Sequence, residues 1–190
     1  MSEHAALLFV CQANMCRSPM AERLTRLALA GRAAPITVTS AGTHAEPEAP
    51  MHPGAVQALI EVGADVTGFG SRLLSAALLS DVDLVLTATR AQRAHCVTLV
   101  PAALGRTFTI RQLGRLAAAV KPDRLAGVEP GARVAALLAE VARVRGAVQP
   151  VPGDQDDLAD PVYGDAADMR GCLRQLQLSL APILTLIAPA

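Results

Sequence analysis

The residues best suited to chemistry lie in one stretch near the start of the chain, Cys11-Gln12-Ala13-Asn14-Met15-Cys16-Arg17-Ser18-Pro19. Five residues separate Cys11 from Arg17, which lets the arginine bend back over the loop and bind two oxygens of a tetrahedral oxyanion. The backbone N–H groups of such a loop, with those of a following helix's first turn, attract anions. A cysteine beside these donors is favoured as its nucleophilic thiolate. The pattern therefore predicts in-line attack on a bound phosphate to give a cysteinyl-phosphate.

Three alternative interpretations of Cys11 and Cys16 compete with this one. Zinc binding lacks a second Cys or His pair at a usable spacing, because Cys96 and Cys172 stand alone. A structural disulfide requires an oxidising compartment, and we find no export signal in the sequence. Ordinary buried thiols are the strongest alternative, because free cysteine often simply packs in a core. The loop pattern favours catalysis over all three, without a metal.

A buried strand and a helix are expected to position this loop. Residues 5–10 form a short apolar run typical of a buried strand, and residues 19–29 are predicted as a helix with proline at its first position. Further strands are predicted at 36–40, 83–88 and 106–110, and further helices at 53–62, 73–79 and 90–100. This alternation predicts an α/β fold, a doubly wound, four-stranded parallel sheet flanked by helices. The loop after the first strand then lies at the carboxyl end of the sheet, where such folds bind ligands.

The later part of the chain is expected to add helices to a single domain spanning residues 1–190. Residues 111–152 are predicted to form a helical insertion, whose centre at 131–146 carries Val134, Leu137 and Val141 at helical spacing. We expect this helix to pack on the surface of the core, and a lid or partner-binding helix beside the site is the functional alternative. A last helix is predicted at 166–187, where Pro182 would kink or break it.

Composition bounds the class of protein. The chain of 190 residues suits one domain with a substantial core. Its formal net charge of zero argues against nucleic acid or a membrane as the main partner. The apolar stretch at 178–190 is too short to span a bilayer, and four unclustered cysteines fit a reducing cytosol. We expect a soluble cytoplasmic protein without a cofactor, and its oligomeric state is open.

Three motifs in one order give the chain a family resemblance. Residues 11–19 resemble the phosphate-binding loop of the low-molecular-weight protein tyrosine phosphatases. Two further matches follow, Ser40-Ala41-Gly42-Thr43 and Asp160-Pro161-Val162-Tyr163-Gly164. The resemblance covers residues 5–105 and 155–188. It implies a hydrolase that acts on a phosphorylated protein or a small aryl phosphate through phosphocysteine.

The resemblance also implies roles for individual side chains. Cys11 would be the nucleophile, and Arg17 would bind the transferring phosphoryl group. The leaving oxygen needs a proton, and the resemblance makes Asp160 the general acid and later the base, while the neighbouring aspartates are expected to be solvated. The expected substrate-binding residues are Gln12, Ala13, Asn14, Met15, Cys16, Ser18 and Tyr163.

Asn14 is expected to hold the loop in shape, because Asn tolerates the left-handed backbone that a tight loop requires. By resemblance, Ser18 and Ser40 would hold its side chain. Ser18 would also donate to the Cys11 sulfur, cap the following helix, or do both. By resemblance, Cys16 would form a reversible disulfide with Cys11, and a small buried residue under the loop is the alternative.

Three departures from the family pattern bear on the site. Ala13 replaces a loop glycine and must avoid a positive φ or accept strain. Phe69 lies near where many members carry a histidine that supports the loop asparagine, so Asn14 is expected to be one partner short. Few aromatic residues are available to flank a phosphotyrosine ring, although Tyr163 would form one wall.

Two other functions stay open. Arsenate reductases resemble this fold and share the loop, which would bind arsenate equally well. Their thioredoxin-coupled form needs two further cysteines close together after the third strand, where only Cys96 lies, so an external thiol would be required. The third possibility is a non-catalytic phosphate-binding or adaptor protein that acts through residues 111–152. The presence of Cys11, Arg17 and Asp160 together argues against it.

Overall fold

Four parallel strands form the centre of the computed structural model, which describes residues 4–32 and 34–188. They run in the order β2-β1-β3-β4, so the first strand along the chain lies inside the sheet. Every strand pair is parallel, which confirms the predicted sheet. The strands are β1 (Ala5–Cys11), β2 (Ile36–Gly42), β3 (Leu84–Thr87) and β4 (Thr107–Thr109).

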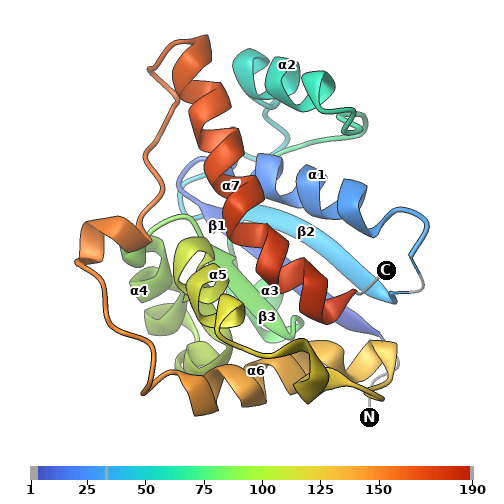
Figure 1. Ribbon diagram of the computed structural model, residues 1–190. Helices are drawn as coiled ribbons and strands as arrows, with labels where there is room; N and C mark the ends of the chain where they lie inside the picture. The colour runs from blue at the N-terminus through green and yellow to red at the C-terminus, as the bar shows by residue number, and fades with distance from the viewer. Residues whose placement is uncertain (1–3, 33, 189–190) are drawn as a thin grey trace.

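Helices cover both faces of this sheet (Figure 1). The larger hydrophobic core joins one face to α1, α2, α5, α6 and α7, and a smaller core joins the opposite face to α3 and α4. This confirms the doubly wound arrangement predicted from the sequence. The helices are α1 (Arg17–Leu29), α2 (Pro53–Glu61), α3 (Ala76–Ser80), α4 (Arg90–Leu99), α5 (Ile110–Ala118), α6 (Arg133–Val144) and α7 (Ala166–Ile187). Short 3₁₀ turns are η1 (Pro101–Arg106), η2 (Pro122–Leu125), η3 (Pro130–Ala132) and η4 (Gly153–Asp156).

β1 is buried on both faces, which explains its unbroken apolar sequence. Leu7 and Phe9 belong to the larger core, whereas Leu8 and Val10 belong to the smaller one. Cys11 follows Phe9 on the same face and also belongs to the larger core. Because side chains alternate along a strand, the last residue of β1 presents its sulfur on the α1 side, at the carboxyl end of the sheet.

α1 begins two residues before its predicted start. Arg17 is its first residue, so Pro19 occupies the third helical position rather than the first. Proline is tolerated there because the first N–H groups of a helix have no intrahelical acceptor. Ser18 lies inside the helix, and the residue at the N-cap position is Cys16, which makes no side-chain cap. The predicted capping role of Ser18 is therefore wrong.

α5 lies at the start of the predicted helical insertion, but its bounds were not predicted from the sequence, because no turn separates it from β4. Thr109 ends the strand and caps the helix, its hydroxyl accepting a hydrogen bond from the N–H of Gln112 at 3.1 Å. The buried residues of α5 include Leu113 and Leu116, which pack towards α7 in the larger core. The two helices cross closely at Gly114, where a Cβ would lie 2.4 Å from the carbonyl oxygen of Ser179.

α6 packs on the core through Val134, Leu137 and Val141, as its spacing predicted. A cavity beside the start of α6 is also lined by Ala5, the first residue of β1, and by Asp83, the residue before β3. This part of α6 therefore lies at the end of the sheet opposite Cys11, as Figure 1 shows. The alternative in which α6 forms a lid over the loop is wrong.

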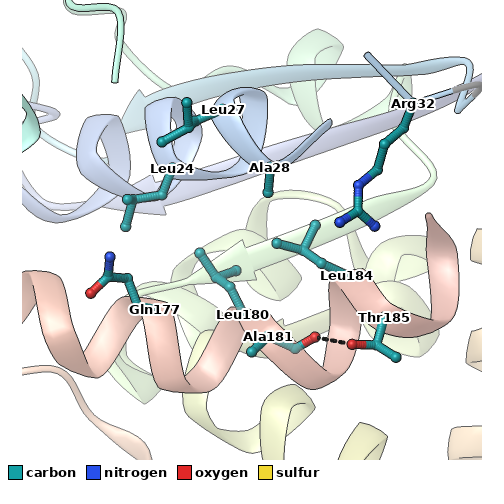
Figure 2. A pocket seen from close by; sticks show the side chains of 9 residues that line it. All are labelled: Leu24, Leu27, Ala28, Arg32, Gln177, Leu180, Ala181, Leu184 and Thr185. Atoms are coloured by element: carbon teal, nitrogen blue, oxygen red, sulfur yellow. Dashed lines mark hydrogen bonds between the residues drawn. The ribbon is translucent and has the colours of Figure 1, made fainter. Parts of the chain in front are cut away.

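α7 covers the predicted residues and packs across α1 and α5. Pro182 lies inside it and does not end it. A groove of about 350 Å³ follows the crossing of α1 and α7, and Figure 2 shows Leu24 and Ala28 of α1 facing Leu180 and Leu184 of α7. The groove follows the C-terminal half of α1, away from the loop that precedes the helix. None of the helices that the structure describes is long and apolar enough to cross a membrane.

Candidate active site

The loop between β1 and α1 is held in place through its carbonyl oxygens. Those of Cys11 and Gln12 accept hydrogen bonds of 3.0 and 2.8 Å from the segment after β2, and that of Met15 accepts one of 3.0 Å from the residue before α2. By contrast, the N–H groups of residues 12–16 donate no hydrogen bond to any residue that the structure describes. A loop tied down by its carbonyls keeps its N–H groups for a ligand, which is the basis of an anion-binding nest.

Asn14 shapes this loop from below, as predicted. Its backbone is left-handed, with φ of 54°, and its side chain is fully buried. The side-chain amide donates to the hydroxyl oxygens of Ser18 and Ser40, both at 2.9 Å. The amide oxygen accepts from the backbone N–H of Arg72, also at 2.9 Å. Every hydrogen-bonding group of the buried Asn14 amide therefore has a partner, which holds the side chain in one position.

The expectation that Asn14 would be one partner short is wrong. Phe69 donates no hydrogen bond to it, but the Arg72 backbone supplies the missing donor. The Arg72 guanidinium also donates to the carbonyl oxygen of Ser40 at 3.1 Å, which ties the segment before α3 to β2. Sequence reasoning missed this support because a backbone amide leaves no mark on residue type.

Gly42 explains why a small-residue motif ends β2. A Cβ at this position would lie 2.5 Å from the carbonyl oxygen of Gln12 and 2.8 Å from the nitrogen of Asn14. Real Cβ atoms do not approach backbone so closely, so the loop can close on β2 only over glycine. Ala13, in contrast, is not among the described residues with positive φ, so its replacement of the family glycine carries no left-handed strain.

The Cys11 sulfur lies 3.0 Å from the hydroxyl oxygen of Ser18, as the resemblance implied. The same hydroxyl lies 3.2 Å from the carbonyl oxygen of Ala41. The serine hydroxyl has one proton to donate. When Cys11 is a thiolate, the hydroxyl donates this proton to the sulfur. When Cys11 is a thiol, the S–H can donate to the serine oxygen, and the hydroxyl can donate to the Ala41 carbonyl oxygen. Ser18 can therefore stabilise the charged sulfur without leaving its own proton unpaired in the other state.

Arg17 and Asp160, which are far apart in the sequence, are in direct contact. Arg17 is only 4% exposed, and its Nη2 forms an ion pair with Oδ2 of Asp160. Nη1 donates to the carbonyl oxygen of Leu158 at 3.2 Å. Nε is buried and has no hydrogen-bond partner among the described residues. The guanidinium is thus oriented by the Asp160 segment and still has donor capacity for an oxyanion.

A pocket of about 210 Å³ brings most of the predicted site residues together. Asn14 and Ser18 do not line it, and their side chains support the loop from below; substrate contact by these two residues stays a prediction. Val162 was not predicted, and its only signal was its place in the Asp160 motif. No three His, Cys, Asp or Glu side chains of the described chain are arranged to hold a metal ion. The pocket is lined by Cys11, Gln12, Ala13, Met15, Cys16, Arg17, Asp160, Val162 and Tyr163.

The described cysteines differ in their surroundings, and all four are free thiols. Burial raises the pKa of Cys16 to about 12, with Asp160 and Cys11 adding to the shift. Burial likewise raises the pKa of Cys172 to about 12. Cys96 belongs to the smaller core on the opposite face of the sheet. The Cys11–Cys16 disulfide stays a prediction, for which both residues line the same pocket.

The segment that carries Asp160 is fastened to the body of the protein by its own aspartates. Both carboxylate oxygens of Asp156 accept from Nη2 of Arg115, at 3.0 and 3.1 Å. The side chain of Asp157 accepts from the N–H of Arg90 at 2.7 Å. Further on, Asp165 caps α7. The expectation that the neighbouring aspartates are solvated is therefore wrong for Asp156, which is buried, whereas Asp154, Asp165 and Asp168 are exposed.

Comparison with known proteins places this geometry in a family. Residues 6–120 match the family model described as low molecular weight phosphotyrosine protein phosphatase. Asp160 lies beyond that match, and its contact with Arg17 comes from the structure alone.

The names of individual relatives state three different activities. The probable low molecular weight protein-tyrosine-phosphatase EpsP of Ralstonia nicotianae is 35% identical over 107 residues, which are 56% of this chain and 71% of that protein. The protein-arginine-phosphatase of Bacillus subtilis is 32% identical over 106 residues, 56% of this chain and 70% of that protein. An arsenate reductase of Bacillus cereus is 33% identical over 101 residues, 53% and 71% of the two chains.

The fold agrees with these relatives. The crystal structure of the Erwinia amylovora tyrosine phosphatase AmsI superposes with a TM-score of 0.68 over 96% of this chain and 93% of that one, at 19% identity. The family match covers more than half of the chain and includes the whole Cys11 to Arg17 loop. The chain therefore belongs to the low molecular weight phosphotyrosine protein phosphatase family of hydrolases.

Proposed function

We propose that this chain is a protein tyrosine phosphatase that hydrolyses aryl phosphates through a cysteinyl-phosphate intermediate. The observation that carries the proposal is the convergence of Cys11, Arg17 and Asp160 on one pocket at the carboxyl end of β1. The N–H groups of residues 12–16 support it, because they donate to no residue that the structure describes, and four of these five residues line the same pocket as Cys11.

Substrate binding exchanges one partner of Arg17 for another. The phosphoryl oxygens accept from the loop N–H groups and from Arg17, whose Nε has no protein acceptor in the described chain. They take the place of the Asp160 carboxylate on Nη2. The released carboxyl then lies beside a phosphate dianion, and like charge favours its protonated form. Binding thus generates the acid that the next step needs.

The first step transfers the phosphoryl group to sulfur. The Cys11 thiolate attacks phosphorus, and the S–P bond forms as the bond to the leaving aryl oxygen breaks. Asp160 gives its proton to that oxygen as it departs. Arg17 and the loop N–H groups stabilise the charge on the equatorial oxygens throughout.

The second step returns the enzyme to its starting state. Water attacks phosphorus, the S–P bond breaks, and its electron pair returns to the sulfur as a thiolate. The Asp160 carboxylate, now the base, accepts a proton from the attacking water. The Ser18 hydroxyl, 3.0 Å from the sulfur, stabilises the leaving thiolate. Inorganic phosphate is the product.

The walls of the pocket favour a flat apolar leaving group. Met15 and Val162 line it, and Tyr163 at its mouth is 99% exposed, so its ring is free to stack on an aryl ring. We therefore propose a phosphorylated protein or a small aryl phosphate in the cytoplasm as the substrate.

Arsenate reduction is the second candidate, and it rests on the arsenate reductase among the relatives. The loop would bind arsenate as it binds phosphate. Cys96 lies on the other face of the sheet and cannot serve as the relay thiol, whereas Cys16 lines the same pocket as Cys11. An external thiol would have to supply the electrons.

One assay series separates these functions. Purified protein is given p-nitrophenyl phosphate, a phosphotyrosine peptide, a phosphoarginine peptide and arsenate, each with and without added thiol, beside the Cys11→Ser variant. The proposal expects thiol-independent phosphate release from the two aryl phosphates, abolished in Cys11→Ser, while that variant still binds vanadate. Turnover of arsenate alone, with thiol, would replace the proposal by the second candidate. Unchanged release by Cys11→Ser would refute both.

A further inference from the structure

A second polar cavity lies behind the loop, between α1, β2 and the segment after α2. Its volume is about 320 Å³, and it shares no lining residue with the active-site pocket. None of the catalytic steps proposed above uses it. Its charged lining residues are three arginines and two glutamates: Glu22, Arg23, Arg26, Glu48 and Arg72.

Arg23 is the unusual member of this group. Its side chain is only 5% exposed, and its guanidinium lies over the ring of Phe69, 5.9 Å from the ring centre. The nearest acceptor is Oε1 of Glu22, 3.8 Å from Nε, which is an ion pair but not a hydrogen bond. No N–H of this guanidinium donates a hydrogen bond to a described residue. Its Nε is a buried donor without an acceptor among the described residues, which is costly and so points to a ligand.

Both carboxylate oxygens of Glu22, the acceptor nearest to Arg23, are already in use. Glu22 accepts from Ser40 at 2.5 Å through Oε2, and its Oε1 lies 2.9 Å from Nη2 of Arg26. Arg26 and Arg72 additionally donate to backbone carbonyl oxygens of β2. Glu48 forms no ion pair with any described residue. Three guanidinium groups therefore line the cavity with two carboxylates, and its buried unsatisfied donor is the Nε of Arg23.

We propose that this cavity is a second anion site, which binds a phosphate dianion, either free or as the monoester of a small molecule. Arg23 is its principal ligand, and Arg26 and Arg72 provide further positive charge. A guanidinium fork suits the oxygens of phosphate, and the cavity leaves room for a small organic group. The occupant would contact Ser40 and Arg72, the same residues that hold Asn14 under the catalytic loop.

Binding of inorganic phosphate to a set of crossed variants tests this site. Isothermal titration calorimetry is performed on the wild type, Arg17→Met, Arg23→Gln and the double variant. We expect two sites in the wild type, one in each single variant and none in the double variant. The proposal is overturned if Arg17→Met binds no phosphate. It is also overturned if Arg17→Met and the double variant Arg17→Met/Arg23→Gln bind phosphate equally well. If the loop itself binds no phosphate, Arg17→Met will match the wild type, which contradicts the proposed function and leaves this site standing.

Three controls keep the result interpretable. Arg145→Gln removes one exposed guanidinium elsewhere and should leave both sites intact. Arg26→Gln tests the cavity through a side chain that is 46% exposed, in case Arg23→Gln does not fold, and should weaken the second site at least threefold. Ethylphosphonate, which cannot be hydrolysed, distinguishes a monoester from free phosphate: tighter binding than phosphate to Arg17→Met assigns the site to monoesters. Equal binding of all probes by Arg26→Gln and Arg145→Gln would refute the assignment.

Discussion

At the scale of single residues, the ion pair between Arg17 and Asp160 joins two groups that act at different times in the proposed mechanism. The arginine holds the carboxylate while the loop has no oxyanion, and an oxyanion competes for the same Nη2. The pairing therefore couples release of the acid to arrival of the group that it will protonate. It also explains how two residues 143 positions apart act together in one reaction.

The leaving-group dependence of hydrolysis tests the role of Asp160. Asp160→Asn keeps the shape of the side chain and removes its transferable proton. We expect hydrolysis of phenyl phosphate, which has a poor leaving group, to fall by about 10²–10⁴-fold. Hydrolysis of p-nitrophenyl phosphate should fall much less, because its phenolate leaves without a proton. Steady-state kcat for the two substrates gives the comparison, and equal losses would mean that Asp160 does not donate the proton.

Thiol reactivity should separate Cys11 from the other cysteines. A pKa of about 12 for Cys16 and Cys172 leaves them almost wholly protonated at pH 7, with a thiolate fraction on the order of 10⁻⁵. Because a raised pKa delays ionisation, this protection lasts until the pH approaches 12. We expect iodoacetamide at pH 7 to label Cys11 first and abolish activity, with peptide mass spectrometry locating the label. Inorganic phosphate should protect Cys11 from iodoacetamide. Labelling of Cys16 as fast as that of Cys11 would contradict the prediction.

At the scale of elements, the site depends on how β1, α1 and β2 meet. The loop bends over the end of β2, and Gly42 is the position at which the two backbones touch. Asn14 then fixes the loop to α1 through Ser18 and to β2 through Ser40. Three elements thus share one buried amide, so the loop has its shape before substrate binds.

Replacing Gly42 by Ala tests this contact. The added methyl must push the loop backbone away, at a cost of about 1–3 kcal/mol in the free energy of unfolding. Displacing the N–H groups from the phosphoryl oxygens should also lower kcat/KM by about 10²-fold. Gly105→Ala is the matched control, because a Cβ there meets nothing within 4 Å and should change neither quantity. Chemical denaturation and p-nitrophenyl phosphate kinetics measure both effects, and full activity of Gly42→Ala would show that the loop is not fixed by β2.

The sequence predicted these elements well where local pattern determines them. The apolar run of β1, the cysteine loop and α2 (Pro53–Glu61) all lie where residue types and spacing placed them. It failed where distant contacts decide. α5 follows β4 without a turn residue, and α3 (Ala76–Ser80) starts later than predicted because the preceding leucines pair with Gly42 instead. The support of Asn14 by the Arg72 amide was equally invisible, since any residue type offers an N–H.

At the scale of the whole molecule, the question is how a residue near the C-terminus reaches a loop near the N-terminus. The chain leaves α6, passes η4 (Gly153–Asp156) and is fastened to α5 by Arg115 and to α4 by Arg90. It then pairs with the end of β3, where Leu158 donates to the carbonyl oxygen of Ala88 at 2.9 Å. Two residues later comes Asp160. The hydrogen bonds that fasten this segment, which motif matching does not describe, set the position of Asp160, the proposed acid.

Loosening that fastening should affect acid catalysis more than nucleophilic attack. Arg115→Gln leaves the carboxylate of Asp156, which is 8% exposed, without its partner, and should lower the free energy of unfolding by about 1–3 kcal/mol. Because Asp160 is then held less firmly, hydrolysis of phenyl phosphate should fall more than that of p-nitrophenyl phosphate.

The double variant Arg115→Gln/Asp156→Asn separates these two effects, because it removes the uncompensated charge while restoring an amide pair. We expect the double variant to recover most of the lost free energy of unfolding. We also expect it to restore the wild-type ratio of the phenyl phosphate rate to the p-nitrophenyl phosphate rate, because the segment that carries Asp160 returns to its place. A single variant that loses stability with an unchanged rate ratio would show that Asp160 is positioned by Arg17 alone. The long path from α6 would then contribute to folding but not to the placement of the acid.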